Sequence, residues 1–208
     1  MKRLYVLILL LMGTNSYADL CNSTTAFPTA YYPQWFALIY YGKMTNDNLG
    51  EVIAFNYSLN KDTLYSLEIG KELNPCNPVR RFLQPIMSSV DFRGNFTVLQ
   101  DTYGDILEFN PYIAFNWYHF PWRHKFKTTI SVGEGISYVT KVPYSEEKNS
   151  EEAKKLLNFL LLDLAFGLPS HPEWEIIARI HHRSGAFGLY HANNTGSTAV
   201  GLALRYWF

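Results

Sequence analysis

Apolar and polar residues alternate along most of the chain after about residue 50, in segments separated by runs of turn-forming residues. In 104–118, for example, Leu107, Phe109 and Ile113 fall on one face, whereas Glu108 falls on the other. A period of two residues is typical of β-strands whose two faces meet different surroundings. The pattern predicts eight strands, at 50–58, 63–73, 86–100, 104–118, 127–140, 154–167, 174–187 and 198–208.

These strands predict an all-β fold, an eight-stranded antiparallel transmembrane β-barrel in the bacterial outer membrane. Aromatic residues gather near strand ends, at 117–122 and 206–208, as in interfacial girdles, and the chain ends within a strand at Phe208. Charge recurs on the polar face, which favours a narrow polar lumen: Asp91, Arg93, Glu108, Arg179 and Arg205. Alternation alone would also fit a soluble lipocalin-like barrel with an apolar interior.

The connections between strands predict how the barrel is oriented. The short stretches at 119–126 and 167–172 are expected on the periplasmic side. The longer stretch at 141–150, which carries Glu146 and Glu147, is then expected outside the cell. Eight strands leave a lumen just wide enough for side chains, so we expect no central pore for solutes.

The N-terminus has the pattern of a secretory signal peptide, residues 1–18. Lys2 and Arg3 precede an apolar run at 4–12, and small residues precede a cleavage site after Ala18. The run is too short to be a transmembrane anchor, which is the alternative. The mature chain is then expected to hold a segment of uncertain structure at 19–49 and the barrel at 50–208.

The two cysteines of the mature chain, Cys21 and Cys76, are expected on the periplasmic side of this barrel. Paired thiols are favoured in an oxidising exported compartment, so a disulfide is predicted, with two free thiols as the alternative. Counting 34–44 as a further strand would give nine strands and place the two cysteines on opposite sides. Residues 27–44 are therefore left as an unassigned aromatic segment.

Composition excludes several other classes of protein. The chain has 18 basic and 18 acidic residues, and signal cleavage removes two basic ones, leaving 16 against 18. A nucleic-acid-binding protein would normally carry a basic face. Aromatic residues make up 16% and charged residues 17%, which is unlike a disordered chain. After the N-terminus, no apolar run has the length of a membrane-spanning helix.

Candidate chemistry lies in the strand that begins WEIIARIHHRSGAFG at Trp174. Residues of equal parity share a face of a strand, and the face with Arg179 and Arg183 must be the lumen side. His182 and Ser184 then project outward, toward lipid, near the extracellular end. An imidazole and a hydroxyl two residues apart suit the base and the nucleophile of an esterase, although such pairs also arise by chance.

A metal site built from His181, His182 and His191 is not favoured. His181 and His182 point to opposite faces of the strand, and no carboxylate follows Glu175 in the chain. No metal is therefore predicted.

The export signal, the eight strands, the aromatic C-terminus and His-x-Ser near the outer end of the seventh strand together resemble the PagL-type lipid A 3-O-deacylase family. The specific part of the likeness is the final stretch, HHRSGAFGLYHANNTGSTAVGLALRYWF. The resemblance implies an outer-membrane barrel that hydrolyses an acyl ester of lipid A without a cofactor. It makes Ser184 the nucleophile, His182 the base and Asn194 the loop asparagine that helps to form the oxyanion hole.

The family's glutamate, which orients the histidine from the last strand, has no counterpart here. Its place, counted back from the C-terminus, falls on Thr198, which has outward parity but no charge. Asn158 on the neighbouring strand is another neutral candidate for orienting the ring. Asp163 is expected to pair with Arg179 in the lumen, and Glu134 has outward parity on a strand that does not adjoin the seventh.

The sequence thus predicts an outer-membrane esterase that removes an ester-linked acyl chain from lipid A. Its expected partner is lipopolysaccharide in the outer leaflet, with no nucleic acid and no cofactor, and whether it forms a homodimer is left open. A non-catalytic outer-membrane barrel with a structural or lipid-binding role is the main alternative, supported by the missing carboxylate. An adhesin-like barrel that works through its loops is a third.

Overall fold

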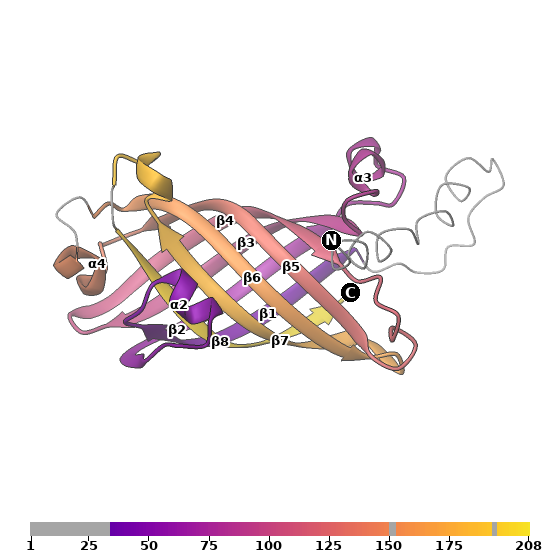
Figure 1. Cartoon of the computed structure of the whole chain (residues 1–208), viewed down its shortest axis with the longest axis horizontal. Helices are drawn as coiled ribbons and strands as arrows, with labels where there is room; N and C mark the ends of the chain where they lie inside the picture. Colours follow the sequence, from indigo (N-terminus) through magenta and orange to yellow (C-terminus); the bar gives the residue numbers. More distant parts are fainter. Residues whose placement is uncertain (1–33, 150–152, 193–194) are drawn as a thin grey trace, which may run out of the picture.

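The protein is a closed barrel of eight antiparallel strands, in which each strand pairs with its neighbours in the chain and β8 pairs back onto β1 (Figure 1). The computed structural model describes residues 34–149, 153–192 and 195–208. The strands are β1 (Trp35–Thr45), β2 (Leu59–Glu72), β3 (Ser89–Asp101), β4 (Gly104–Trp117), β5 (Lys127–Val139), β6 (Leu156–Leu168), β7 (His171–Ser184) and β8 (Gly196–Trp207). Closure leaves no sheet edge, which is the condition for a sheet in lipid. The predicted fold class is confirmed.

The first strand of the barrel is β1, and the prediction of a strand at 50–58 was wrong. That segment instead contains α2 (Leu49–Ile53), whose first turn is fixed by a capping box between Asn48 and Glu51. The count stays at eight because the segment at 34–44, which was left unassigned, supplies the missing strand. The barrel therefore begins at Trp35 and not at residue 50.

The two ends of the barrel differ in their connections (Figure 1). One end, called the terminal end, holds the start of β1, the end of β8, the helix α3 (Pro78–Leu83) and the connections at 118–126 and 169–170. The other, called the loop end, holds α2, the β3–β4 turn, α4 (Tyr144–Asn149) and the short 3-10 helix η2 (Ala186–Gly188). The stretches at 119–126 and 167–172 thus share an end and lie opposite 141–150, as predicted.

Cys76 lies between β2 and α3, at the terminal end where β1 also begins. Cys21 lies outside the described residues, so its pairing with Cys76 stays a prediction. None of the helices in the described part of the chain is long and apolar enough to cross a membrane.

The outer face of the barrel is apolar. Large hydrophobic side chains stand exposed on every strand, among them Ile39, Leu67, Ile69, Phe92, Phe96, Leu107, Ile113, Ile130, Ile136, Leu164, Ile176 and Leu202. A continuous apolar surface of this kind is unstable in water but favourable against lipid tails. The alternation predicted for 104–118 is confirmed: Leu107, Phe109 and Ile113 face outward, and Glu108 faces the lumen.

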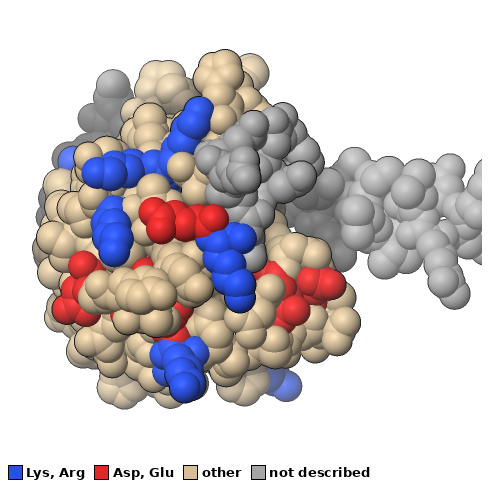
Figure 2. Space-filling model, turned by 90° about the vertical axis from the view of Figure 1, so that its left-hand side faces the viewer, with Lys and Arg blue, Asp and Glu red and all other residues tan. Residues whose placement is uncertain are grey.

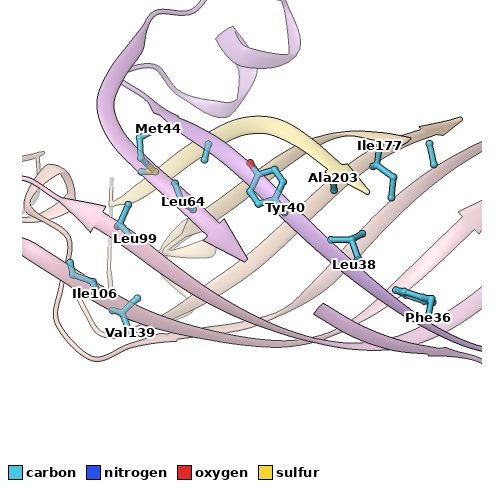
Figure 3. Packing of buried hydrophobic residues seen from close by; sticks show 12 residues of the cluster. Phe36, Leu38, Tyr40, Met44, Leu64, Leu99, Ile106, Val139, Ile177 and Ala203 are labelled. Carbon is cyan, nitrogen blue, oxygen red and sulfur yellow. The ribbon is translucent and has the colours of Figure 1, made fainter. Parts of the chain in front are cut away.

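The lumen is filled by ion pairs and by apolar side chains. Arg179 donates from Nη1 to Glu68 Oε2 at 2.7 Å and from Nε to Asp163 Oδ1 at 2.8 Å. Arg93 also contacts Asp163, at 3.3 Å, so that two arginines share one carboxylate. An apolar cluster, drawn in Figure 3, extends from Phe36 near the start of β1 to Met44 and Leu64 toward the loop end. The predicted pairing of Asp163 with Arg179 is confirmed.

We expect Arg179→Ala to destabilise the barrel by about 3–5 kcal/mol, because it removes the cation that lies nearest to both buried carboxylates, Glu68 and Asp163. The measurement is urea unfolding of protein refolded into lipid vesicles. The matched control is Arg123→Ala in the exposed connection between β4 and β5, where a change within about 0.5 kcal/mol is expected. Equal effects of the two substitutions would show that the lumen network does not stabilise the barrel.

Candidate active site on the outer wall of the barrel

Strand β7 presents His182 and Ser184 on the outer, lipid-facing side of the barrel, as the parity of the sequence predicted. The alternate residues Arg179, His181 and Arg183 are each only 2% exposed and face the lumen. His181 Nε2 lies 3.0 Å from Glu108 Oε1, and Arg183 Nη1 donates to Ser137. Because β7 ends at Ser184, the outward pair lies at the loop end of the wall.

Thr198 holds the imidazole of His182. The two residues are directly opposite each other in the β7–β8 pairing, and His182 Nδ1 lies 2.9 Å from Thr198 Oγ1. Thr198 is 2% exposed, and its backbone carbonyl accepts a hydrogen bond from Thr45 Oγ1 at 3.2 Å. The side chain predicted to stand in the place of the family's glutamate therefore contacts the predicted base.

Ser184 has different neighbours on its two sides. Asn158 of β6 lies opposite it on one side, and Gly196 of β8 lies opposite it on the other. A Cβ at Gly196 would come within 2.3 Å of the Arg183 carbonyl oxygen, and the φ of Gly196 is +156°, so a side chain cannot be accommodated there. The space beside Ser184 on the β8 side is thus free of a side chain from the paired position.

The hydroxyl of Ser184 and the imidazole of His182 are not hydrogen bonded to each other. Positions i and i+2 on one face of a strand are separated by about 6.6 Å along the strand. A proton can pass between them only when both side chains turn toward each other. Catalytic hydrogen bonds are often long or poorly aligned in the absence of substrate, and they tighten when it binds.

Two asparagines were candidates for assisting the pair. In the β6–β7 pairing, Asn158 lies opposite Ser184 and not opposite His182. Its amide therefore lies beside the proposed nucleophile and not beside the Nδ1 side of the imidazole. Thr198 and not Asn158 therefore orients the imidazole. Asn194 lies outside the described residues, and its part in an oxyanion hole stays a prediction.

No carboxylate within the described residues contacts His182. Asp163 faces the lumen and pairs with Arg179. Glu134 is exposed on the outer face of β5, but Leu160 of β6 stands between it and His182 in the same row of cross-strand partners. On the convex wall of a narrow barrel, side chains two strands apart diverge, which keeps Glu134 away from the ring.

Glu146 is a residue of the site region that sequence reasoning did not identify. It was expected in an external loop, yet α4 turns it inward, where it is 0% exposed. Its Oε1 accepts from Arg183 Nε at 3.0 Å and from Ser197 Oγ at 2.6 Å. Arg183 and Ser197 immediately adjoin the outward residues in their strands, so Glu146 ties β7 to β8 behind the candidate site.

Within the described ranges, no group of three or more His, Cys, Asp or Glu side chains is placed to hold a metal ion. His181 and His182 face opposite sides of the wall, and His191 lies in the β7–β8 connection.

No protein-family model matches the chain, and no curated protein matches it. Among solved structures, the chain is similar to the outer membrane enzyme PagL, with 13% identity and a TM-score of 0.50, over 82% of this chain and 98% of that one. It is also similar to Neisserial surface protein A (8% identity, TM-score 0.48, 85% and 98% covered) and to the N-terminal barrel domain of Pseudomonas aeruginosa OprF (11%, 0.44, 84% and 98%). These identities are too low to transfer an activity. With its closed sheet and apolar outer face, the chain is an eight-stranded barrel of the bacterial outer membrane.

Proposed function

We propose that this protein is an outer-membrane esterase that removes an ester-linked acyl chain from lipid A of lipopolysaccharide. The observation that carries the proposal is the outward His182–Thr198 hydrogen bond, two residues along β7 from the outward Ser184. A polar group on a lipid-facing wall is costly, and at such depths polar residues commonly serve function. The resemblance of the C-terminal stretch to PagL-type deacylases supports the same assignment.

The mechanism follows from which ring nitrogen is engaged. The mechanism requires the tautomer in which Nδ1–H of His182 donates to Thr198 Oγ1, because Nε2 is then unprotonated and able to accept a proton. Ser184 Oγ gives this proton up as it attacks the ester carbonyl, and Nε2–H then returns it to the departing sugar hydroxyl. Water enters from the loop end and attacks the acyl carbonyl as it gives a proton to the same nitrogen. Nε2–H then returns this proton to Ser184 Oγ as the fatty acid leaves.

The negative oxygen of the tetrahedral intermediate needs hydrogen-bond donors. Asn158 lies opposite Ser184 in the β6–β7 pairing, and its side-chain amide is one candidate donor. Asn194 is a second candidate from the sequence. Each such donor is typically worth about 10²–10³ in rate. Among the described residues no carboxylate contacts the imidazole, so we expect a slower enzyme than one with a complete Ser-His-acid triad, in which the acid stabilises the imidazolium.

A second function is supported by one specific observation. No carboxylate contacts His182 within the described residues, and no hydrogen bond joins Ser184 to it. The same outward polar group could then bind lipid headgroups without cleaving them, in a barrel with a structural or lipid-binding role. A fluorophosphonate probe separates the two functions: labelling at Ser184 supports the enzyme, whereas an unlabelled protein supports the binding barrel.

We expect Ser184→Ala and His182→Ala each to abolish release of a hydroxy fatty acid from lipopolysaccharide, because each removes one partner of the proton transfer. The measurement is mass spectrometry of lipid A from outer-membrane vesicles with and without the protein. Ser170→Ala, in the exposed turn at the terminal end, is the matched control and should retain full activity. Wild-type protein that is folded and leaves the lipid A mass unchanged contradicts the proposal.

We further expect Thr198→Glu to raise the hydrolysis rate by at least about tenfold, because a carboxylate on Nδ1 stabilises the imidazolium that forms during attack. Thr198→Val should instead lower the rate, since it removes the acceptor and leaves the ring free to take the wrong tautomer. Thr198→Asp provides a shorter side chain where glutamate does not fit the buried position. Rates that are the same in all three variants would mean that position 198 does not act through His182.

A further inference from the structure

A polar cleft of about 760 Å³ lies at the loop end, directly beside His182 and Thr198. One wall comes from the end of β1 and the segment that leads into α2, a second from the start of β2, and a third from α4. The floor is the start of β8, at 195–198. Figure 2 views the barrel from this end, where basic and acidic side chains are interspersed over the surface. A volume of this size is typical of small-molecule sites.

The side chains that line the cleft suit a ligand with many hydroxyl groups. Amide and carboxylate groups predominate, contributed by Asn46, Asp47, Asn60 and Asp62, while the Asn48 amide is engaged with Glu51. Asn offers both donors and acceptors and Asp offers acceptors, which is what the hydroxyls of a sugar require. Tyr144 adds an aromatic ring, whose apolar face can pack against the C–H face of a sugar.

Two lysines add positive charge from different walls. Lys61 lies at the start of β2, and Lys148 lies in α4. Among the described residues, neither ammonium group takes part in a hydrogen bond or ion pair. A pair of uncommitted lysines on opposite sides of a cleft is suited to phosphate groups.

One buried group in the cleft lacks a partner. The Thr195 side chain is 6% exposed, and its Oγ1 forms no hydrogen bond within the described part of the chain. Buried hydroxyls are nearly always satisfied, so an unpaired one that lines a cavity indicates a place for a ligand or an ordered water. Thr195 lines the same cleft as His182 and Thr198.

The cleft is held in shape by hydrogen bonds that do not involve its open side. Asp47 Oδ2 accepts from the Ser58 backbone N–H at 2.6 Å and from Ser58 Oγ at 3.1 Å, which closes the β1–β2 connection on itself. Thr102 Oγ1 donates to Asp62 at 3.4 Å and links this wall to the β3–β4 turn. A site that is already formed loses less entropy on binding.

We propose that this cleft binds the phosphorylated sugar headgroup of a glycolipid whose acyl chain lies against the apolar wall below it. The inference rests on the proposed function for the fate of the acyl chain, but the headgroup site stands on the cleft itself. In a glycolipid, the ester joins the polar headgroup to the apolar chain. His182 lines the cleft and belongs to the lipid-facing wall, so an ester of a lipid bound in this way lies at the candidate catalytic group.

The test measures binding to the full-length mature Ser184→Ala protein in phosphatidylcholine nanodiscs, so that no turnover intervenes. The probes are the water-soluble, fully deacylated glucosamine disaccharide of lipid A with both phosphates, and the same disaccharide without phosphate. We expect the double variant Lys61→Gln/Lys148→Gln to bind the phosphorylated probe at least about tenfold more weakly. Lys71→Gln, an exposed strand lysine near the terminal end, is the matched control and should bind it unchanged.

Two results would overturn the proposal. Equal affinity for the phosphorylated and unphosphorylated disaccharides would remove the role of the lysines, and displacement of the probe by inorganic phosphate at comparable concentration would make the site one for free phosphate. Because the assay uses a protein without the nucleophile, a lack of hydrolysis in wild type leaves this measurement unaffected. Suppose that Ser184→Ala abolishes hydrolysis but the lysine double variant binds the phosphorylated probe unchanged. The headgroup site is then refuted, whereas the proposed esterase function is not.

Discussion

The structure depends on a constraint of closure: every residue in a barrel strand faces either lipid or a lumen that has no room for bulk water. The charged side chains on the inner face must therefore pair with one another. Arg179 does so with Glu68 and Asp163, and Arg183 does so with Glu146 and Ser137. These pairs fix which face of β7 is inside. The outward position of His182 and Ser184 is thus a consequence of ion pairing on the other side of the same strand.

A shift of β7 by one residue would be strongly unfavourable. It would bring Arg179 and Arg183 to the lipid face, where each arginine costs about 2–4 kcal/mol near the middle of the membrane, and would strand their carboxylate partners in the lumen. Glu146 adds a restraint that does not come from the sheet, since it reaches both Arg183 on β7 and Ser197 on β8. The geometry of the His182–Thr198 pair is therefore held from behind, by a network that the lipid never contacts.

Alternation in the sequence was enough to predict the barrel, seven of its eight strands and both faces of β7. β1 was missed because the strand wrongly predicted at 50–58 completed the count of eight, which made 34–44 a surplus ninth strand. Alternation misassigned 50–58, where a capping box overrides a strand-like pattern. The position of the family's glutamate, counted back from the C-terminus, pointed to Thr198, which lies opposite His182 in the structure. Nothing comparable could place Glu146, because its position depends on how a loop helix folds over the barrel end.

A neutral residue as the partner of His182 is consistent with the surroundings of Thr198. Thr198 is almost fully buried beside a lipid-facing surface, and an ionised carboxylate in that position would lack a counter-charge until the imidazole becomes protonated. A hydroxyl orients the ring without this cost to the resting protein, but it cannot stabilise the imidazolium that forms during attack on an ester. An anionic headgroup bound in the adjoining cleft would bring negative charge beside the ring only when substrate is present. The charge that a protein carboxylate would hold permanently would then arrive with the lipid.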